Sequence, residues 1–212
     1  MKLIENMVYK NFTSRLLFSF LFIIIYISII IYKFDLIFYL ILLIYALISI
    51  EVFLNFKKFK LLPFVYIFFS CTFFLTIDFN ANNYNSFNLF IFIVILFDSS
   101  SYLVGKIFGK NKLISISPNK TAEGLIGGIL LSFFLSFIFA DILGFIIDIR
   151  LLSFLILIIL CAFVGDIIES YFKRINDLKN SSDLIPGHGG IFDRFDSFLF
   201  SIIFYSISVN FL

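Results

Sequence analysis

The sequence lacks most of what a water-soluble protein of its length needs. Charged residues make up only 14% of its 212 residues, against 61% hydrophobic ones, so the chain has too little polar surface to cover a soluble globule. Tryptophan is absent, and the two cysteines, Cys71 and Cys161, each stand alone in an apolar run. That isolation argues against a disulfide framework and against a thiolate metal site. The composition therefore predicts an integral membrane protein.

Seven apolar segments predict the architecture. They cover residues 16–32, 36–54, 61–77, 87–105, 123–140, 151–168 and 197–212. Several are shorter than the roughly 20 residues that span a bilayer comfortably, but flanking Lys, Arg and Tyr side chains extend such segments by reaching to the interface. We expect an all-α, polytopic membrane helix bundle of about seven transmembrane helices. No internal repeat, Gly/Ser-rich linker or signal-peptide cleavage site is visible, so we expect a single membrane domain with its first helix retained.

The distribution of Lys and Arg predicts the orientation in the membrane. If the N-terminus is cytoplasmic, the cytoplasmic segments carry 14 of the 16 basic residues, and the outer loops hold only Lys33 and Arg150. The positive-inside rule requires such an asymmetry. The same orientation places two charged loops, 98–128 and 165–197, on the cytoplasmic side, where we expect them to build one site.

The segment 165–197 concentrates residue types that a phosphoryl-transfer site needs. Its ionisable residues include Asp166, Glu169, Lys173, Arg174, Lys179, His188, Asp193, Arg194 and Asp196. Removing charges from water is costly unless they are paired or bound to metal, so we interpret the segment as a functional site. A solvated loop that binds anionic lipid headgroups would explain the basic residues. It would not explain carboxylates at helical spacing, or three glycines around the only histidine.

The spacing of the carboxylates predicts a site for a divalent cation. One helix face at the end of the sixth apolar segment presents Asp166, Glu169, Ser170 and Lys173. Asp193 and Asp196 are three residues apart and share a face if the seventh helix begins there. Two such helix ends facing each other can hold Mg²⁺ through oxygen ligands.

Basic side chains and a glycine-rich turn in the same segment are suited to phosphate groups. Arg174 and Arg194 offer a bidentate fork, whereas Lys173 and Lys179 offer point charges. In the Pro-Gly-His-Gly-Gly turn at 186–190, a backbone without bulky side chains can approach a ligand closely and offer N–H groups.

The loop 98–128 carries weaker signals. Asp98 lies well inside an apolar run, so it needs a partner or a polar cavity. Residues 117–124 resemble a helix start, and Lys120 beside a helix N-terminus is suited to an anion. A P-loop is excluded for two reasons: the glycines at 105–110 have the wrong spacing, and this segment follows a membrane helix rather than a strand. The glycines at 124–128 favour a close helix-packing face over a ligand loop.

Together these motifs resemble those of a known family. The pattern S-Y-F-K-R-x4-K-N-x-S-x-L-I-P-G-H-G-G-I-F-D-R-F-D, residues 170–196, closely resembles the signature of the phosphatidate cytidylyltransferases, also called CDP-diacylglycerol synthases. Similar family motifs occur at 98–102, 109–110, 117–124 and 165–170. The resemblance covers 98–212, which we expect to form the catalytic region. Residues 1–97 resemble a trimmed version of the family's variable N-terminal helices.

The resemblance implies a reaction and its surroundings. CTP and phosphatidic acid would become CDP-diacylglycerol and pyrophosphate, with Mg²⁺ required and a second, monovalent cation left open. The implied partners are these two substrates and membrane lipids, with no nucleic acid and with a homodimer left open. The implied location is the bacterial inner membrane, with the active site facing the cytoplasm.

The resemblance also implies roles for individual residues. The metal ligands would be Asp166, Asp193 and Asp196. The catalytic set would be Asp166, Lys173, Lys179, His188, Asp193, Arg194 and Asp196. Substrate binding would involve Asp98, Tyr102, Lys110, Ser117, Lys120, Thr121, Glu123, Glu169, Ser170, Arg174, Gly189 and Gly190.

Three departures from the family pattern leave alternatives open. Asn180 stands where the family usually has Asp, Ala122 where it usually has Trp, and Ser100 in a stretch where it usually has small residues with Gly. An inactive homologue and a CTP-dependent enzyme with another lipid acceptor are the alternatives within the family. Outside it, a small transporter would also place charges at membrane depth, but it should show broken helices at the midplane.

Overall fold

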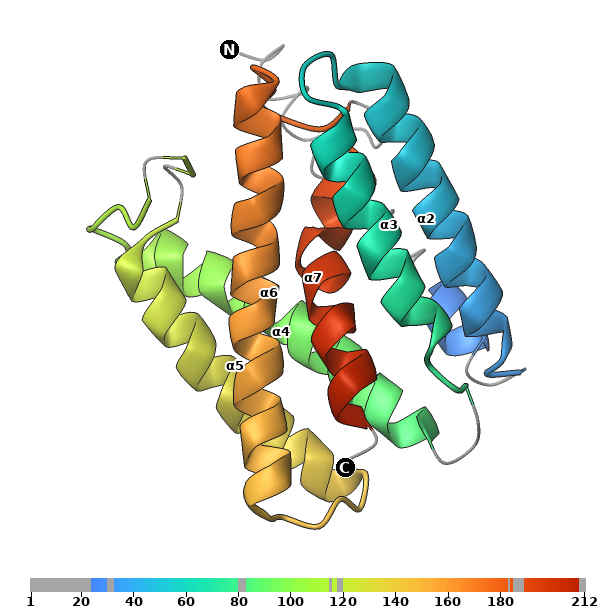
Figure 1. Cartoon of the computed structure of the whole chain (residues 1–212). Helices are drawn as coiled ribbons and strands as arrows, with labels where there is room; N and C mark the ends of the chain where they lie inside the picture. Colours follow the sequence, from blue (N-terminus) through green and yellow to red (C-terminus); the bar gives the residue numbers. More distant parts are fainter. Residues whose placement is uncertain are drawn as a thin grey trace, which may run out of the picture.

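The computed structural model is all-helical in its described parts, which are residues 24–29, 33–79, 83–114, 116–117, 120–182, 184 and 189–209. Its helices are α2 (Leu36–Asn55), α3 (Leu61–Leu75), α4 (Tyr84–Phe108), α5 (Ala122–Ile142), α6 (Ile149–Ile175) and α7 (Phe192–Ser208) (Figure 1). Residues 24–29, within the first predicted segment, are also helical. Each later predicted segment coincides with a helix, so the all-α prediction is confirmed.

Four helices account for the membrane character of the protein. α2, α4, α5 and α6 are each long and apolar enough to cross a membrane. α3 is apolar but has only 15 residues, which at 1.5 Å per residue is about 22 Å, short of a hydrocarbon core of about 30 Å. The chain is therefore an integral membrane protein with four candidate spans, and the count of seven spans stays a prediction.

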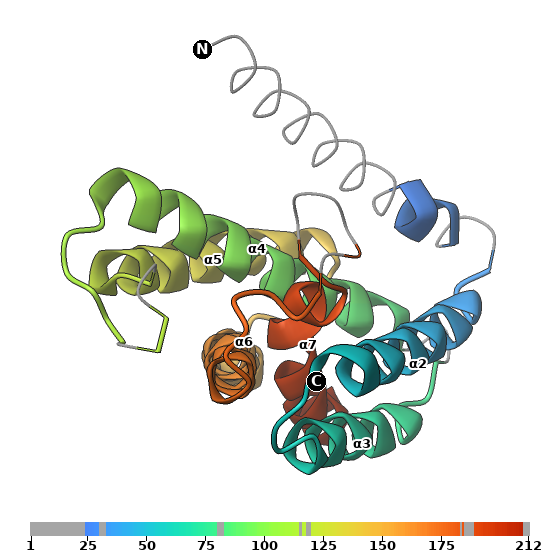
Figure 2. The ribbon, with the colours of Figure 1, turned by 90° about the horizontal axis from the view of Figure 1, so that it is seen from above.

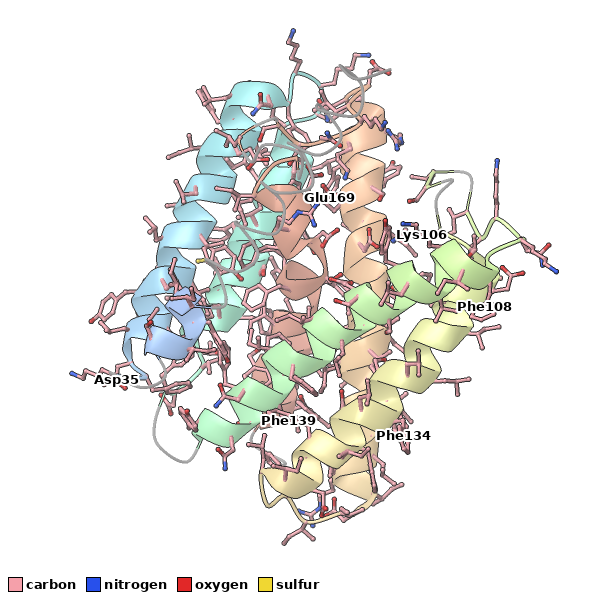
Figure 3. The ribbon with its side chains drawn as sticks, turned by 180° about the vertical axis from the view of Figure 1, so that it is seen from behind. Asp35, Lys106, Phe108, Phe134, Phe139 and Glu169 are labelled. Carbon is pink, nitrogen blue, oxygen red and sulfur yellow. The ribbon has the colours of Figure 1, made fainter. Side chains whose placement is uncertain are left out.

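α7 lies at the centre of the bundle. It contacts α6 on one side, α2 and α3 on another, and α4 behind (Figures 1 and 2). α4 and α5 form a hairpin that runs obliquely across α6 and α7, as the view from behind shows (Figure 3). The central position explains why α7 buries apolar side chains such as Phe198 and Ile202 although its first turn is charged.

Glycines on α5 allow α4 to approach closely. A Cβ at Gly124 would lie 2.8 Å from the Ser101 carbonyl oxygen, and one at Gly128 would lie 2.6 Å from Ser101 Cβ. Both distances are below van der Waals contact, so only glycine fits at these positions. The predicted packing face at 124–128 is thereby confirmed.

The three basic connections gather at one end of the bundle, the upper end in Figure 1. These are the α2–α3 turn, the α4–α5 loop and the α6–α7 connection. Lys58 Nζ lies 2.6 Å from Asp177 Oδ2, and Arg174 Nε donates to the Ile116 carbonyl over 3.1 Å. The end of α6 is therefore tied to both other connections, and the arrangement agrees with the predicted division of charge. The basic residues at positions 2, 10 and 15 lie outside the described residues.

Candidate active site

The site is built at the end of α6 and the start of α7. α6 continues to Ile175, beyond the apolar segment predicted to end at 168, because its last turns are buried against α7 rather than in lipid. Asp166, Glu169 and Lys173 therefore lie in one helix, as their spacing predicts. α7 begins at Phe192, so Asp193 falls in its first turn. Gly165 allows the two helices to approach, since a Cβ there would lie 2.6 Å from the Asp196 carbonyl oxygen.

Three carboxylates converge between these helices. One oxygen each from Asp166, Glu169 and Asp196 lies within 4.8 Å of the other two. Glu169 is fully buried and is marked inside the bundle in Figure 3. Among the described residues, its Oε1 has no hydrogen-bond partner, whereas its Oε2 lies beside Lys173. Oxygen ligands at such separations suit a hard divalent cation, so this cluster can hold a metal ion.

Lys173 balances part of this negative charge. Its Nζ lies 2.7 Å from Glu169 Oε2 and 2.7 Å from Asp193 Oδ1. Asp193 Oδ2 accepts hydrogen bonds from the backbone N–H groups of Ser181 (2.9 Å) and Gly190 (2.8 Å). Both oxygens of Asp193 are thus engaged within the protein. Its role as a metal ligand stays a prediction, and the structure groups Glu169 with Asp166 and Asp196 instead.

Gly189 and Gly190, the last two residues of the glycine-rich turn, lie against Asp193. Gly189 has φ +83°, a conformation that favours glycine, and a Cβ there would overlap Asp193 Oδ2. The Gly190 N–H, which the sequence suggested for a ligand, is used by Asp193. His188 lies outside the described residues.

The α4–α5 loop reaches the acidic cluster through Lys120. Its Nζ lies 2.5 Å from Asp166 Oδ2 and 5.5 Å from the centre of the Phe163 ring. On α4, Asp98 has the partner that its membrane depth requires, because the Ser197 hydroxyl donates to Asp98 Oδ1 over 2.8 Å. The structure thus brings residues of the two charged loops together.

Several other predicted residues shape the α4–α5 loop. Thr121 caps α5 by accepting the Gly124 N–H, which confirms the predicted helix start. The Glu123 carboxylate accepts the Lys110 N–H over 3.0 Å and Asn111 Nδ2 over 2.7 Å. The Ser117 carbonyl accepts the Lys120 N–H over 3.1 Å. In this structure these hydrogen bonds stabilise the α4–α5 loop itself.

The remaining predicted residues lie around the rim or inside the bundle. Lys179 is exposed in the α6–α7 connection and Arg194 in the first turn of α7. Arg174 also donates to the Leu178 carbonyl over 2.8 Å. Tyr102 is 64% exposed on α4, and Lys106 Nζ lies 6.0 Å from the centre of its ring. Ser170 is buried in α6.

Comparison with known proteins places this arrangement in a family. The sequence profile of the cytidylyltransferase family matches residues 2–212. The chain belongs to the cytidylyltransferase family. The match extends beyond the region in which the motifs were found, and it includes the N-terminal helices.

Bacterial members of this cytidylyltransferase family are similar over part of the chain. The phosphatidate cytidylyltransferase of Staphylococcus haemolyticus is 47% identical over 116 residues, which cover 53% of this chain and 44% of that protein. The phosphatidate cytidylyltransferase of Bacillus subtilis is 43% identical over 129 residues, covering 59% and 48%. The matched part of the chain thus spans about half the length of these curated relatives.

One further residue near the site has no motif to mark it in the sequence. Glu51, near the end of α2, is 1% exposed, and its Oε2 accepts the N–H of Ile191 over 2.7 Å and that of Phe192 over 3.3 Å. By hydropathy, Glu51 falls within the apolar segment 36–54. The signal was present, because Glu51 is the only charged residue in α2, just as Asp98 stands alone in its own apolar run.

Proposed function

We propose that the chain transfers the cytidylyl group of CTP to phosphatidic acid, giving CDP-diacylglycerol and pyrophosphate. The observation that carries the proposal is the partly buried cluster of Asp166, Glu169 and Asp196, flanked by Lys120 and Lys173, in a chain of this family. A lipid phosphate and a nucleoside triphosphate are both anionic. A site that joins them must neutralise charge at a membrane surface, and this end of the bundle gathers cations and carboxylates there.

The reaction requires one bond to form and one to break. A phosphate oxygen of the lipid attacks the α-phosphorus of CTP in line, and the bond from that phosphorus to the bridging oxygen breaks, so that pyrophosphate leaves with the electron pair. Lys120 and Lys173 are held by carboxylates at the cluster, where they can stabilise the charge that develops on phosphate oxygens. The lipid phosphate is already anionic near neutral pH, so no general base is needed.

The residues present fit a magnesium ion. The three carboxylates supply only oxygen donors, and the buried Oε1 of Glu169 has no hydrogen-bond partner within the described part of the chain, which leaves it available to a cation. Asp166, Glu169 and Asp196 would hold it. When bound, Mg²⁺ would neutralise part of the negative charge of the triphosphate. Asp193 stays a predicted metal ligand. We propose no residue for a second, monovalent cation.

The exposed basic residues are proposed to receive the substrate phosphates. Lys179 lies in the α6–α7 connection, and Arg194 lies in the first turn of α7. We place this end of the bundle on the cytoplasmic side of a bacterial plasma membrane, where CTP is available. The excess of Lys and Arg on this side supports that orientation.

The test is a direct assay of lipid product. Purified protein would receive CTP labelled at the α-phosphate and phosphatidic acid, with and without Mg²⁺, and the lipids would be separated and identified by mass. We expect labelled CDP-diacylglycerol only when all three components are present, and none from an Asp166→Asn variant. A labelled lipid that requires another phosphorylated acceptor would contradict the assignment of phosphatidic acid. Absence of any CTP-dependent lipid would contradict the reaction.

A further inference from the structure

Glu51 is an unusual residue for its surroundings. It is the only charged residue of α2, a helix long and apolar enough to cross a membrane, yet it is buried within the protein. A carboxylate at such a position is costly. Its Oε1 is buried and, among the described residues, has no hydrogen-bond partner. The cost of burying it must be offset by the contacts that it makes.

The contacts of Glu51 lie at the start of α7. The first N–H groups of a helix have no partner within the helix, and Ile191, at the N-cap of α7, provides no side-chain hydrogen bond. Glu51 Oε2 accepts the N–H groups of Ile191 and Phe192 from a position 140 residues earlier in the sequence. A negative charge at a helix N-terminus is also favoured by the helix dipole. Glu51 thus caps α7 from another helix.

The capped residues lead directly into the site. Phe192 is followed by Asp193, which binds Lys173 and the N–H groups of Ser181 and Gly190. A Cβ at Gly190 would overlap both Glu51 Oε1 and Ser181 Oγ. The glycine at this position of the turn is therefore required because the Glu51 carboxylate occupies the space beside it.

We propose that Glu51 is a positioning residue for the transfer reaction: it fixes the start of α7 and the turn at 189–190, and through them Asp193 and Lys173. The kinetic consequence of this inference rests on the proposed function, whereas the capping of α7 by Glu51 does not. A small displacement of Asp193 and Lys173 would disturb alignment in the transition state more than binding of the nucleotide. The consequence is a fall in kcat rather than a rise in KM.

The test compares Glu51→Gln and Glu51→Asp with a matched control, Ser70→Ala, in the full-length protein. Ser70 is also buried and also binds α7, since its hydroxyl donates to the Leu199 carbonyl over 2.6 Å, but away from the helix start. We expect Glu51→Gln to lower kcat at least about tenfold, with KM for CTP changed less than about threefold. Glu51→Asp, which keeps the charge, should restore part of kcat, and Ser70→Ala should keep it.

A second readout does not depend on activity. Hydrogen exchange of the peptide that contains Ile191 and Phe192 should be faster in Glu51→Gln than in the unmodified protein, and unchanged in Ser70→Ala. An unmodified protein that forms no CDP-diacylglycerol would refute the proposed function, and the exchange result would still decide whether the cap exists. Unchanged exchange, a normal kcat in Glu51→Gln, or an equal loss of kcat in Ser70→Ala would overturn the positioning role. If Glu51→Gln does not fold, kcat and hydrogen exchange of Glu51→Asp are compared with those of Ser70→Ala instead.

Discussion

Lys120 and Asp166 join the two charged loops of the chain. Lys120 precedes α5 and Asp166 lies in α6, and their side chains meet at 2.5 Å while both are largely shielded from solvent. The Ser197–Asp98 hydrogen bond makes a parallel link between α7 and α4. The two contacts hold the ends of four helices around the acidic cluster. The site is therefore a product of the whole arrangement of helices, although its motifs lie far apart in the sequence.

Lys173→Met should destabilise the protein. The substitution leaves Glu169, which is fully buried, and Asp193 without their common cation, and breaking a buried ion pair by removing one partner costs about 3 kcal/mol or more. Thermal unfolding in detergent measures the effect. Lys58→Met is the matched control, because the Lys58–Asp177 pair is exposed and contributes less than about 1 kcal/mol. Equal unfolding temperatures for the two variants would contradict the prediction.

Glu169→Gln should weaken divalent-cation binding. Glu169 lies with Asp166 and Asp196 in the acidic cluster, and replacing one carboxylate by a neutral amide should lower affinity about tenfold or more. Titration with Mn²⁺, followed by electron paramagnetic resonance, measures this without any substrate. Asp148→Asn, at the start of α6 and so at the opposite end of that helix, is the control and should bind Mn²⁺ normally. Equal affinities in the two variants would remove Glu169 from the metal site.

Asp193→Asn should abolish turnover, to below about 1% of the unmodified rate, while the protein still folds and inserts. A neutral amide cannot balance Lys173, and it cannot replace a charged ligand if Asp193 also contacts the cation. The lipid assay measures turnover, and the Mn²⁺ titration of the same variant separates the two roles. Near-normal activity at limiting Mg²⁺ would contradict both.

The sidedness of the loops can be tested by labelling of introduced cysteines. After Cys71 and Cys161 are replaced by alanine, Asn111→Cys and Asn180→Cys should react with an impermeant reagent from the cytoplasm. Both positions are exposed in the structure. Asp78→Cys, in the α3–α4 connection at the opposite end of the bundle, should react from outside. Labelling of the first two from opposite sides would be incompatible with a single site.

The sequence predicted which residues belong to the site better than it predicted which of them contact each other. Helical spacing placed Glu169 and Lys173 on one face, and the Thr121 cap marked the start of α5, because both signals are local. The partners of Asp193 were not predictable in the same way. They depend on how α6, α7 and the turn at 189–190 pack together, and a carboxylate at the end of a helix can serve a lysine or a metal ion equally well.

Long-range contacts explain the two other differences. Glu51 belongs to the half of the chain that showed no motif, and only the fold reveals that it reaches the start of α7. α7 begins at Phe192, whereas the apolar segment was predicted from 197. Its charged first turn is satisfied by Lys173 and Glu51 rather than by water, so hydropathy could not identify it as part of the helix.

Asn180→Asp should change the rate or the Mg²⁺ dependence modestly, and the natural protein should be active without it. Asn180 is exposed at the connection, and a Cβ at Gly189 would lie 3.4 Å from Asn180 Cβ, so the position borders the glycine turn. The cluster of Asp166, Glu169 and Asp196 already supplies more than the one or two carboxylates that Mg²⁺ usually takes from a protein. An added carboxylate therefore joins a site that has enough charge. The lipid assay at graded Mg²⁺ concentrations compares the two proteins. If the natural chain makes no CTP-dependent lipid and Asn180→Asp does, the natural protein has lost its activity through this substitution.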